Sequence, residues 1–282
     1  MGPLLRPGSR TDRAALALLA LGAVAGLYSV ALEPYWVEVT RHTVPAAIAR
    51  PITLAHVTDL HTYGLGRREG RLLALLEEAR PDAIVLTGDN LVDGDPWSPT
   101  LGQAEDPAYA FAAPVLRRMR APLGVFAVRG TWEETRHTRD ERGYYRSLGV
   151  RFLLNEAAEL VPGVWLAGLG DSGPNAGQAA RDIPAGAFVV GLFHSPAIFD
   201  GVAGHWPLSL AGHTHGGQVR IPFVRPWLPE GSGPYLAGWY SSKGSRLYVS
   251  RGVGWAMLPV RFGCRPELAL ITLVPNGATP TR

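Results

Sequence analysis

The stretch ITLAHVTDLH, residues 52–61, joins an apolar run to two side chains of types that often bind metals. The run is short and apolar, which is typical of a buried strand, and Asp59 and His61 follow it directly. A leucine-rich segment, residues 68–80, then has the spacing of an amphipathic helix, and a second apolar run follows at residues 83–86. This order predicts a strand–helix–strand unit with parallel strands and a right-handed crossover, and therefore an α/β fold.

Three further clusters of metal-binding residue types follow apolar runs in the same way. They are Asp89 and Asn90 after residues 83–86, His194 after residues 187–193, and His213 with His215 after residues 208–211. Side chains at the carboxyl ends of neighbouring strands can converge although they are far apart in the sequence. Two carboxylates and four imidazoles suit divalent cations such as Mn²⁺, Zn²⁺ or Fe²⁺. The pattern predicts a dinuclear metal site.

The composition is that of a globular protein with many tight turns. The chain has 282 residues, of which 46% are hydrophobic and 18% charged, and it contains 34 glycines and 24 prolines. The net charge of +3 is small and the arginines are spread along the chain, so nucleic-acid binding is not indicated. Cys264 is the only cysteine, which excludes an intramolecular disulfide.

The first 32 residues differ from the rest of the chain. Residues 14–32 carry no charge and are long enough to span a membrane as a helix, whereas Arg6, Arg10 and Arg13 precede them. A cleaved signal peptide, with residues 29–31 as its cleavage site, and a buried helix are the alternatives. We predict a retained single-pass anchor in the inner membrane. The preceding arginines place the N-terminus in the cytoplasm and the main body on the extracytoplasmic side.

The remaining sequence alternates between helical and strand patterns. We expect a connector at residues 33–51, a main domain at residues 52–274 and a tail at residues 275–282. Further expected elements are a helix at residues 109–119 and strands at residues 124–128, 164–169, 188–193, 246–249 and 268–274.

Taken together, these motifs resemble the calcineurin-like metallophosphoesterase superfamily. The shared features are Asp-x-His, Gly-Asp-Asn-x-x-Asp, a later lone His and Gly-His-x-His, in this order. The N-terminal span, Glu33-Pro34, the form GHTHGGQ at residues 212–218, and the segments 248–252 and 266–268 are similar to its membrane-associated bacterial branch. The resemblance covers about residues 32–274. It implies a two-sheet β-sandwich flanked by helices, and hydrolysis of a phosphodiester or phosphoanhydride by a hydroxide that bridges two metal ions.

The resemblance also implies a role for individual residues. One metal would be held by Asp59, His61 and His215, the other by His194 and His213, and Asp89 would bridge them. Asp89, His213 and Asn90 are the candidate catalytic residues, and Asp93 would orient a ligand from outside the site.

One segment departs from the pattern. Where the superfamily usually has Gly-Asn-His followed by an acidic residue, this chain has Gly130-Thr131-Trp132-Glu133. Thr131 offers only a neutral hydroxyl in place of the amide ligand, and Trp132 cannot protonate a leaving group. Glu133, Glu134 or His137 could substitute, but we expect a solvated polar loop here. A degenerate metal- or phospholipid-binding membrane protein with little turnover is therefore the alternative to an enzyme.

Other histidines and aromatic residues are predicted to be structural. His42, His56 and His205 have no partner at ligand spacing. Late in the chain lie Trp206, Trp227, Trp239, Tyr240 and Trp255. They could line a lipid groove or meet the membrane interface, but we expect loop and core packing. A phosphorylated substrate from a lipid or envelope precursor would suit a membrane-anchored site. The diphosphate of a nucleotide-activated diacyl sugar is an alternative that would need a cytoplasmic site.

Overall fold

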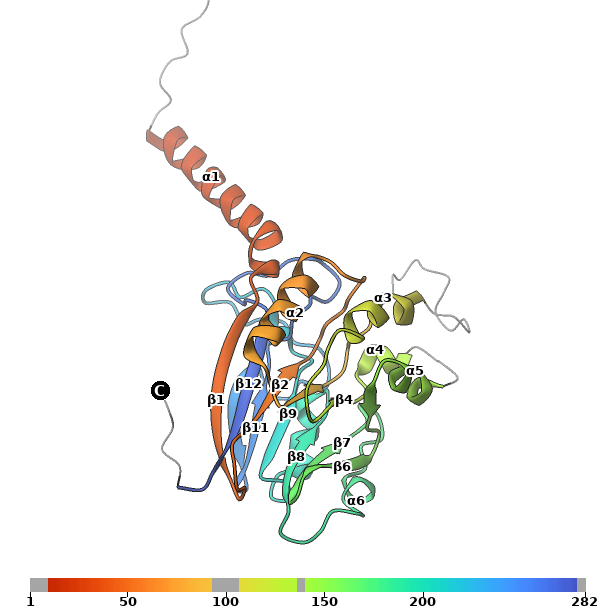
Figure 1. The fold of residues 1–282 in the computed structure, drawn as a ribbon. Coiled ribbons are helices and arrows are strands. Elements are labelled where there is room, and N and C mark those ends of the chain that lie inside the picture. The colour runs from red at the N-terminus through yellow and green to blue at the C-terminus, as the bar shows by residue number, and fades with distance from the viewer. Residues whose placement is uncertain (1–9, 93–106, 136–139, 278–282) are drawn as a thin grey trace, which may run out of the picture.

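The computed structural model describes residues 10–92, 107–135 and 140–277, and within them two six-stranded sheets (Figure 1). The first sheet contains, in spatial order, β1 (Glu38–Ala46), β12 (Glu267–Pro275), β2 (Ile52–Val57), β3 (Ala83–Leu86), β4 (Val125–Ala127) and β5 (Val150–Phe152). The second contains β10 (Gly238–Ser242), β11 (Ser245–Val249), β9 (Leu208–Ala211), β8 (Phe188–Leu192), β7 (Val164–Gly168) and β6 (Glu156–Val161). For most of these strands, the bounds predicted from the sequence agree with the observed bounds to within one or two residues.

The two sheets pack face to face through a shared apolar layer. Leu54, Val85 and Ile271 of the first sheet belong to the same buried cluster as Val190 and Leu210 of the second. These strands are buried on both faces, which explains why they are almost continuously apolar. The predicted two-sheet sandwich is confirmed.

Helices cover the outer face of each sheet. On the first sheet lie α2 (Arg67–Ala79), α3 (Pro107–Leu116) and α5 (Glu141–Ser147), and short helices α6 (Ala176–Ala179) and α7 (Phe199–Val202) lie against the second. Leu72 and Leu76 of α2 pack with Val57 and Leu86 in one buried cluster. The predicted helix at 68–80 is confirmed, as is the parallel pairing of β2 with β3.

The segment expected to be a connector contains a strand. β1 pairs with β12 in parallel over nine residues, from Glu38–Glu267 to Ala46–Pro275. It is an edge strand whose side chains are only partly buried, so its sequence lacks the apolar run of an inner strand. Pro45 is tolerated because an edge strand needs only one of its sides to form hydrogen bonds.

A long N-terminal helix projects from the domain. α1 (Arg10–Ala31) leads into a 3₁₀ turn, η1 (Glu33–Tyr35). The stretch Thr11–Tyr35 is long and apolar enough to cross a membrane and is largely exposed. The buried carboxylate of Glu33 accepts hydrogen bonds from the backbone N–H groups of Gly263 and Cys264. The root of α1 is therefore fixed to the domain.

Candidate metal centre and active site

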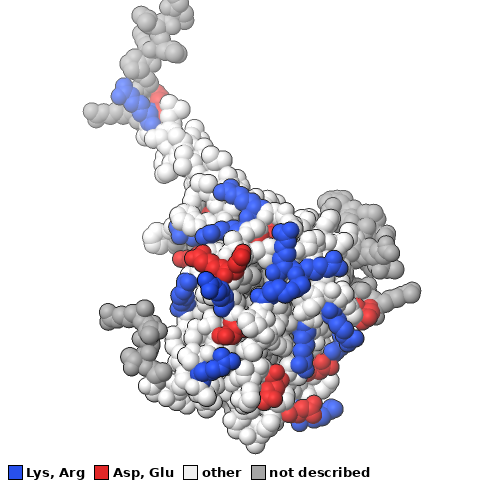
Figure 2. Space-filling view, viewed as in Figure 1, with Lys and Arg blue, Asp and Glu red and all other residues white. Residues whose placement is uncertain are grey.

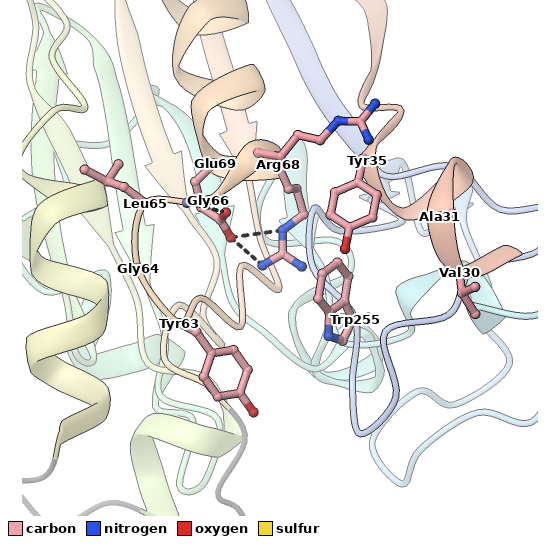
Figure 3. A pocket seen from close by; sticks show the side chains of 11 residues that line it. Val30, Ala31, Tyr35, Tyr63, Gly64, Leu65, Gly66, Arg68, Glu69 and Trp255 are labelled. Atoms are coloured by element: carbon pink, nitrogen blue, oxygen red, sulfur yellow. Dashed lines mark hydrogen bonds and ion pairs between the residues drawn. The ribbon is translucent and has the colours of Figure 1, made fainter. Parts of the chain in front are cut away.

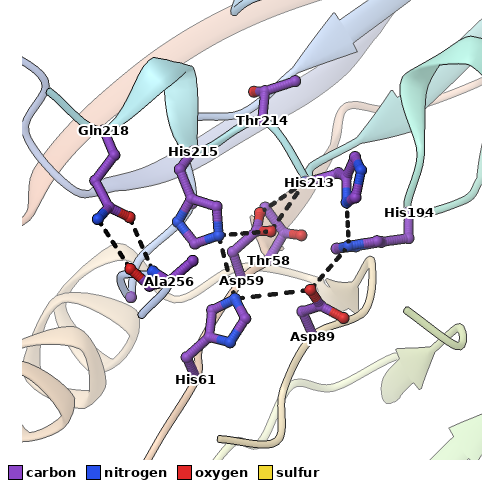
Figure 4. Close-up of polar contacts among 12 residues, drawn as sticks. Thr58, Asp59, His61, Asp89, His194, His213, Thr214, His215, Gln218 and Ala256 are labelled. Carbon is purple, nitrogen blue, oxygen red and sulfur yellow. Dashed lines mark hydrogen bonds and ion pairs between the residues drawn. The ribbon is translucent and has the colours of Figure 1, made fainter. Parts of the chain in front are cut away.

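Six buried side chains converge where strands of the two sheets end (Figure 4). They are Asp59 and His61 after β2, Asp89 after β3, His194 after β8, and His213 and His215 after β9. All six were predicted from the sequence as metal ligands. The structure places them in two groups of three, each with its ligand atoms within 4.8 Å of one another.

The first group is Asp59, His61 and His215. The Nε2 atoms of the two histidines lie 3.2 Å apart, and His215 Nε2 lies 3.4 Å from Asp59 Oδ1. Ligands held ~2.0–2.2 Å from one cation stand about 3–3.5 Å from each other. The spacing of these three atoms therefore fits a common cation.

The second group is Asp89, His194 and His213. His194 Nε2 lies 3.1 Å from Asp89 Oδ2 and 3.0 Å from His213 Nδ1. The same Asp89 oxygen lies 3.7 Å from His61 Nε2 of the first group. Asp89 therefore stands between the two groups, where a bridging carboxylate would have to be.

Hydrogen bonds orient the imidazoles of the second group. The Nδ1–H of His194 donates to the backbone oxygen of Thr87 at 2.8 Å, and the Nε2–H of His213 donates to that of Glu230. Because a carbonyl can only accept, these bonds place a proton on His194 Nδ1 and on His213 Nε2. In its neutral form each imidazole would then offer its other nitrogen, His194 Nε2 or His213 Nδ1, to a cation. Metal-binding histidines are commonly held in this way.

The backbone of the site is unusual. Asp59, His61, Asp89, His213 and His215 all have positive φ, between 39° and 73°. Such left-handed backbone is uncommon for residues other than glycine, and it clusters at functional sites because the surrounding structure must hold it. Five of the six candidate ligands therefore lie on strained turns that the strand ends impose.

Burial and close charges shift the pKa values of the candidate ligands. Burial raises the pKa of Asp59. Burial opposes ionisation of Asp89 too, but the charge and hydrogen bond of His194 outweigh it and lower the pKa of Asp89. Burial and the neighbouring His61 hold the pKa of His215 well below its usual value, which keeps this imidazole neutral. Burial opposes the charged form of His194, but the charge and hydrogen bond of Asp89 outweigh it and hold the pKa of His194 well above its usual value. Buried carboxylates and imidazoles that give up such protons form the donor set that borderline divalent cations prefer.

Comparison with known proteins identifies the fold and chemistry. The sequence model of the calcineurin-like phosphoesterase family matches residues 52–227, which is more than half of the chain. The chain belongs to the calcineurin-like phosphoesterase family. The superfamily and the hydrolase class predicted from the motifs are confirmed. Family membership and the two ligand groups together fit a dinuclear metal site.

Relatives of this calcineurin-like phosphoesterase extend over most of its length. The uncharacterized metallophosphoesterase YkuE of Bacillus subtilis is 29% identical over 92% of this chain and 93% of its own. The phosphodiesterase YaeI of Escherichia coli is 28% identical over 86% and 90%. Among solved structures, the phosphoesterase YfcE from E. coli has a TM-score of 0.33 and 16% identity, covering 81% of this chain and 85% of that one.

Glu133 corrects one expectation about this phosphoesterase. It lies in α4 (Thr131–Thr135) and is buried, so the predicted solvated polar loop is wrong at this position. Its carboxylate accepts hydrogen bonds from the backbone N–H groups of Asp89 at 2.9 Å, Asn90 at 2.7 Å and Gly130 at 3.0 Å. Glu133 therefore shapes the turn that carries Asp89. The sequence did contain a signal for this role, because the superfamily pattern has an acidic residue at the position of Glu133.

The residues that depart from the motif lie beside the second group. The Thr131 hydroxyl donates to Asp171 Oδ2 at 2.8 Å, and the backbone N–H of Trp132 donates to Asp89 Oδ1 at 2.8 Å. Asp171 also accepts from the backbone N–H of Ser195, next to His194. Sequence analysis did not single out Asp171, because it follows no motif.

The other predicted residues have simpler positions. Asn90 is buried, and its side-chain NH₂ donates to Glu133 and to the Tyr145 hydroxyl rather than joining a ligand group. His56 is buried, with its Nε2 2.7 Å from the Thr87 hydroxyl, and His42 Nε2 lies 3.0 Å from the Tyr248 hydroxyl. Neither histidine belongs to the two ligand groups found among the described residues. Asp93 and His137 lie outside the described residues.

Replacing Glu133 should loosen the Asp89 turn. Glu133→Gln puts an NH₂ group against backbone N–H donors, and an unsatisfied buried donor costs about 1–3 kcal/mol. We expect a lower midpoint of thermal unfolding in detergent, together with reduced turnover. Glu134→Gln, on the same helix but half-buried, is the matched control and should change both much less. Equal effects of the two substitutions would show that Glu133 has no special role.

Proposed function

We propose that this chain is a membrane-anchored, metal-dependent phosphohydrolase that cleaves a phosphodiester or phosphoanhydride bond of a lipid or envelope precursor. The observation that carries the proposal is the position of Asp89 between two complete groups of candidate ligands. The name of the related phosphodiesterase YaeI supports the reaction class.

In this proposal each group binds one divalent cation, Mn²⁺, Zn²⁺ or Fe²⁺. Asp59, His61 and His215 would hold the first, His194 and His213 would hold the second, and Asp89 would serve both. When bound, the two cations would activate water and neutralise charge on the phosphate. An imidazole that binds a cation through its lone pair is neutral. The charge of the two cations would therefore exceed that of the two carboxylates and favour binding of an anionic phosphate.

The chain's own residues position the reaction. The Glu133 carboxylate and the Trp132 N–H fix both the backbone and Oδ1 of Asp89, so its Oδ2 is directed at the histidines. The indole N–H of Trp132 can donate a hydrogen bond, but it does not ionise near neutral pH and so cannot serve as a general acid for a departing alkoxide. We therefore propose that the preferred substrates have leaving groups that are already stable as anions.

The proposed location is the inner membrane, with α1 as a single-pass anchor and the catalytic domain outside the cytoplasm. Arg10 and Arg13 before the apolar span support this orientation. A relative from Danio rerio, 25% identical over 92% of this chain and 62% of its own length, is named a transmembrane protein with a metallophosphoesterase domain. That name supports membrane association.

A second candidate is a metal- or phospholipid-binding protein with little turnover. The observation that favours it is the engagement of Thr131 with Asp171, which leaves a neutral hydroxyl in place of the amide ligand. Turnover distinguishes the two candidates.

Hydrolysis of bis(4-nitrophenyl) phosphate by the full-length protein in detergent, with Mn²⁺ present, tests the proposal. We expect turnover that His215→Ala reduces more than about 100-fold, because loss of a ligand should exceed the ~10–100-fold effect of losing an outer partner. His205→Ala replaces an exposed histidine outside both groups and should leave the rate unchanged. Absence of turnover in the parent, with aryl monoesters and diphosphates also inert, would favour the binding protein.

A further inference from the structure

Two neighbouring loops expose large apolar side chains. They belong to residues 219–228 and 255–262, and we call these side chains the apolar rim: Ile221, Phe223, Val224, Trp227, Met257 and Leu258. Isolated exposed apolar residues are ordinary, but a group of this size usually marks a surface that meets a partner or a membrane.

The backbone at the tips of both loops adopts an energetically unfavourable conformation. Phe223 is fully exposed with φ 67°, and Met257 is 83% exposed with φ 60°. Bulky residues are rare in this left-handed region, where glycine or asparagine would be less strained. Contact with water does not stabilise an apolar side chain, and the backbone at these two tips is strained as well. We infer that an apolar environment outside the domain stabilises these side chains.

The rim is firmly attached to the root of α1. The Gln218 side chain joins the two loops, because its amide donates to the backbone oxygen of Ala256 and accepts from the N–H of the same residue. In the second loop, the Arg261 backbone N–H donates to the Ser29 oxygen in α1 at 2.9 Å. The rim and the candidate membrane helix are thus parts of one continuous surface.

The candidate metal centre lies at this same end of the molecule. β1 starts just after η1 and runs away from α1, β12 is parallel to β1, and β2 is antiparallel to β12. The carboxyl ends of β2 and of its parallel neighbour β3 therefore point back toward the root of α1. Only two residues separate His215 from Gln218, whose side chain joins the two rim loops. The candidate metal centre is therefore close to the rim in the sequence.

Aromatic and basic side chains surround the root of α1. The guanidinium of Arg265 lies 3.6 Å from the ring centre of Trp36, and that of Arg67 lies 5.3 Å from the ring centre of Tyr35. Figure 2 shows basic side chains around this root. Tryptophan and tyrosine favour the headgroup region of a bilayer, and arginine pairs with anionic headgroups.

A pocket of about 700 Å³ opens between α1 and the domain (Figure 3). Val30, Tyr35, Tyr63 and Trp255 contribute to its lining, and Arg68 lies 3.9 Å from the ring centre of Trp255. The Arg68 guanidinium also donates to the backbone oxygens of Leu60 and His61. Arg68, which lines the pocket, thus also stabilises the turn that carries the candidate ligand His61.

We propose that the apolar rim inserts into the interface of the same bilayer that α1 enters, so that the candidate metal centre faces the lipid headgroups. Apolar groups at such an interface reach ~5–10 Å below the headgroups, which suits loop tips. We assign the lipid bilayer as the occupant because the rim is joined to α1 through the Arg261–Ser29 hydrogen bond and has basic residues near it. These are the exposed Arg225, within the first rim loop, and Arg67, which lies against Tyr35. This docking does not depend on hydrolysis.

Site-specific labelling of the full-length protein in vesicles tests the docking. Phe223→Cys and Lys243→Cys are each labelled with the fluorophore NBD, and the native Cys264 is buried. Lys243 is the matched control: it is exposed in the β10–β11 hairpin, at the end of the sheet opposite His213. The vesicles contain phosphatidylcholine and phosphatidylglycerol. One set of samples also contains doxyl-labelled lipid, which quenches NBD inside the bilayer, and the other set receives iodide, which quenches NBD exposed to water.

We expect the label at position 223 to be quenched by doxyl lipid and shielded from iodide, and the label at position 243 to show the reverse. Strong iodide quenching at both positions would overturn the proposal. Shielding of position 223 from both quenchers would also overturn it, because the rim would then contact protein, such as a second copy of the chain. Turnover of a soluble aryl diester in the same samples tests the proposed function separately, because that substrate does not need the bilayer.

Discussion

Asp89→Ala should abolish turnover while the fold survives. The Asp89 carboxylate approaches histidines of both groups, at 3.1 Å from His194 Nε2 and 3.7 Å from His61 Nε2. Without it, Asp59 is the one carboxylate left among the candidate ligands, so the negative charge available to hold two cations is halved. We expect the loss to exceed the ~10–100-fold effect of removing an outer partner by a wide margin.

The measurement combines rate and metal content. Rates of bis(4-nitrophenyl) phosphate hydrolysis and metal per chain are determined for the parent, for Asp89→Ala and for Asp182→Ala, which replaces an exposed carboxylate. Asp182→Ala should match the parent in both. Near-normal turnover in Asp89→Ala, with an unchanged thermal unfolding midpoint, would exclude a mechanism in which this carboxylate joins two cations.

Aryl diesters should be hydrolysed much faster than alkyl diesters. No imidazole stands at position 132, so an alkoxide must depart without a proton from that position. General-acid assistance is worth ~10²–10⁴-fold, which sets the expected ratio of aryl to alkyl rates. Trp132→His should raise the alkyl rate selectively. Thr131→Asn should tighten binding of the second cation, because an amide oxygen is a better ligand than a hydroxyl hydrogen-bonded to Asp171.

Rates for both substrate types in the parent and in the two variants check this expectation. If aryl and alkyl diesters react equally fast while the chemical step limits the rate, another residue supplies the proton. Glu133 is a poor candidate for that role, because its oxygens already accept from the backbone around Asp89. Asp171 would be the first residue to replace.

The parts of the fold that sequence reasoning predicted share one property. β2, α2 and β3 are local elements whose buried faces set their own apolar pattern, so their bounds could be predicted almost to the residue. The six candidate ligands could also be predicted, because each follows directly after such a strand. The chemistry of a dinuclear site restricts residue types strongly enough to leave a recognisable motif.

The parts that were missed depend on distant partners. β1 forms a strand because β12, more than 200 residues away, supplies its hydrogen bonds, and its own half-exposed sequence carries little signal. Glu133 lies among polar residues that suggest a loop, and its burial becomes favourable through donors that include the backbone N–H groups of Asp89 and Asn90, more than 40 residues away in the sequence. Asp171 is brought to Thr131 by the packing of the two sheets, which no local pattern reveals.

A titration of the metal-depleted protein with Mn²⁺ tests the central claim most directly. The full-length protein is treated with a chelator and desalted, and hydrolysis of bis(4-nitrophenyl) phosphate is followed as Mn²⁺ is added. The two groups around Asp89 predict no turnover without cations and full turnover when both groups are filled. Undiminished turnover in the metal-depleted protein would contradict a metal-dependent site built from these six residues.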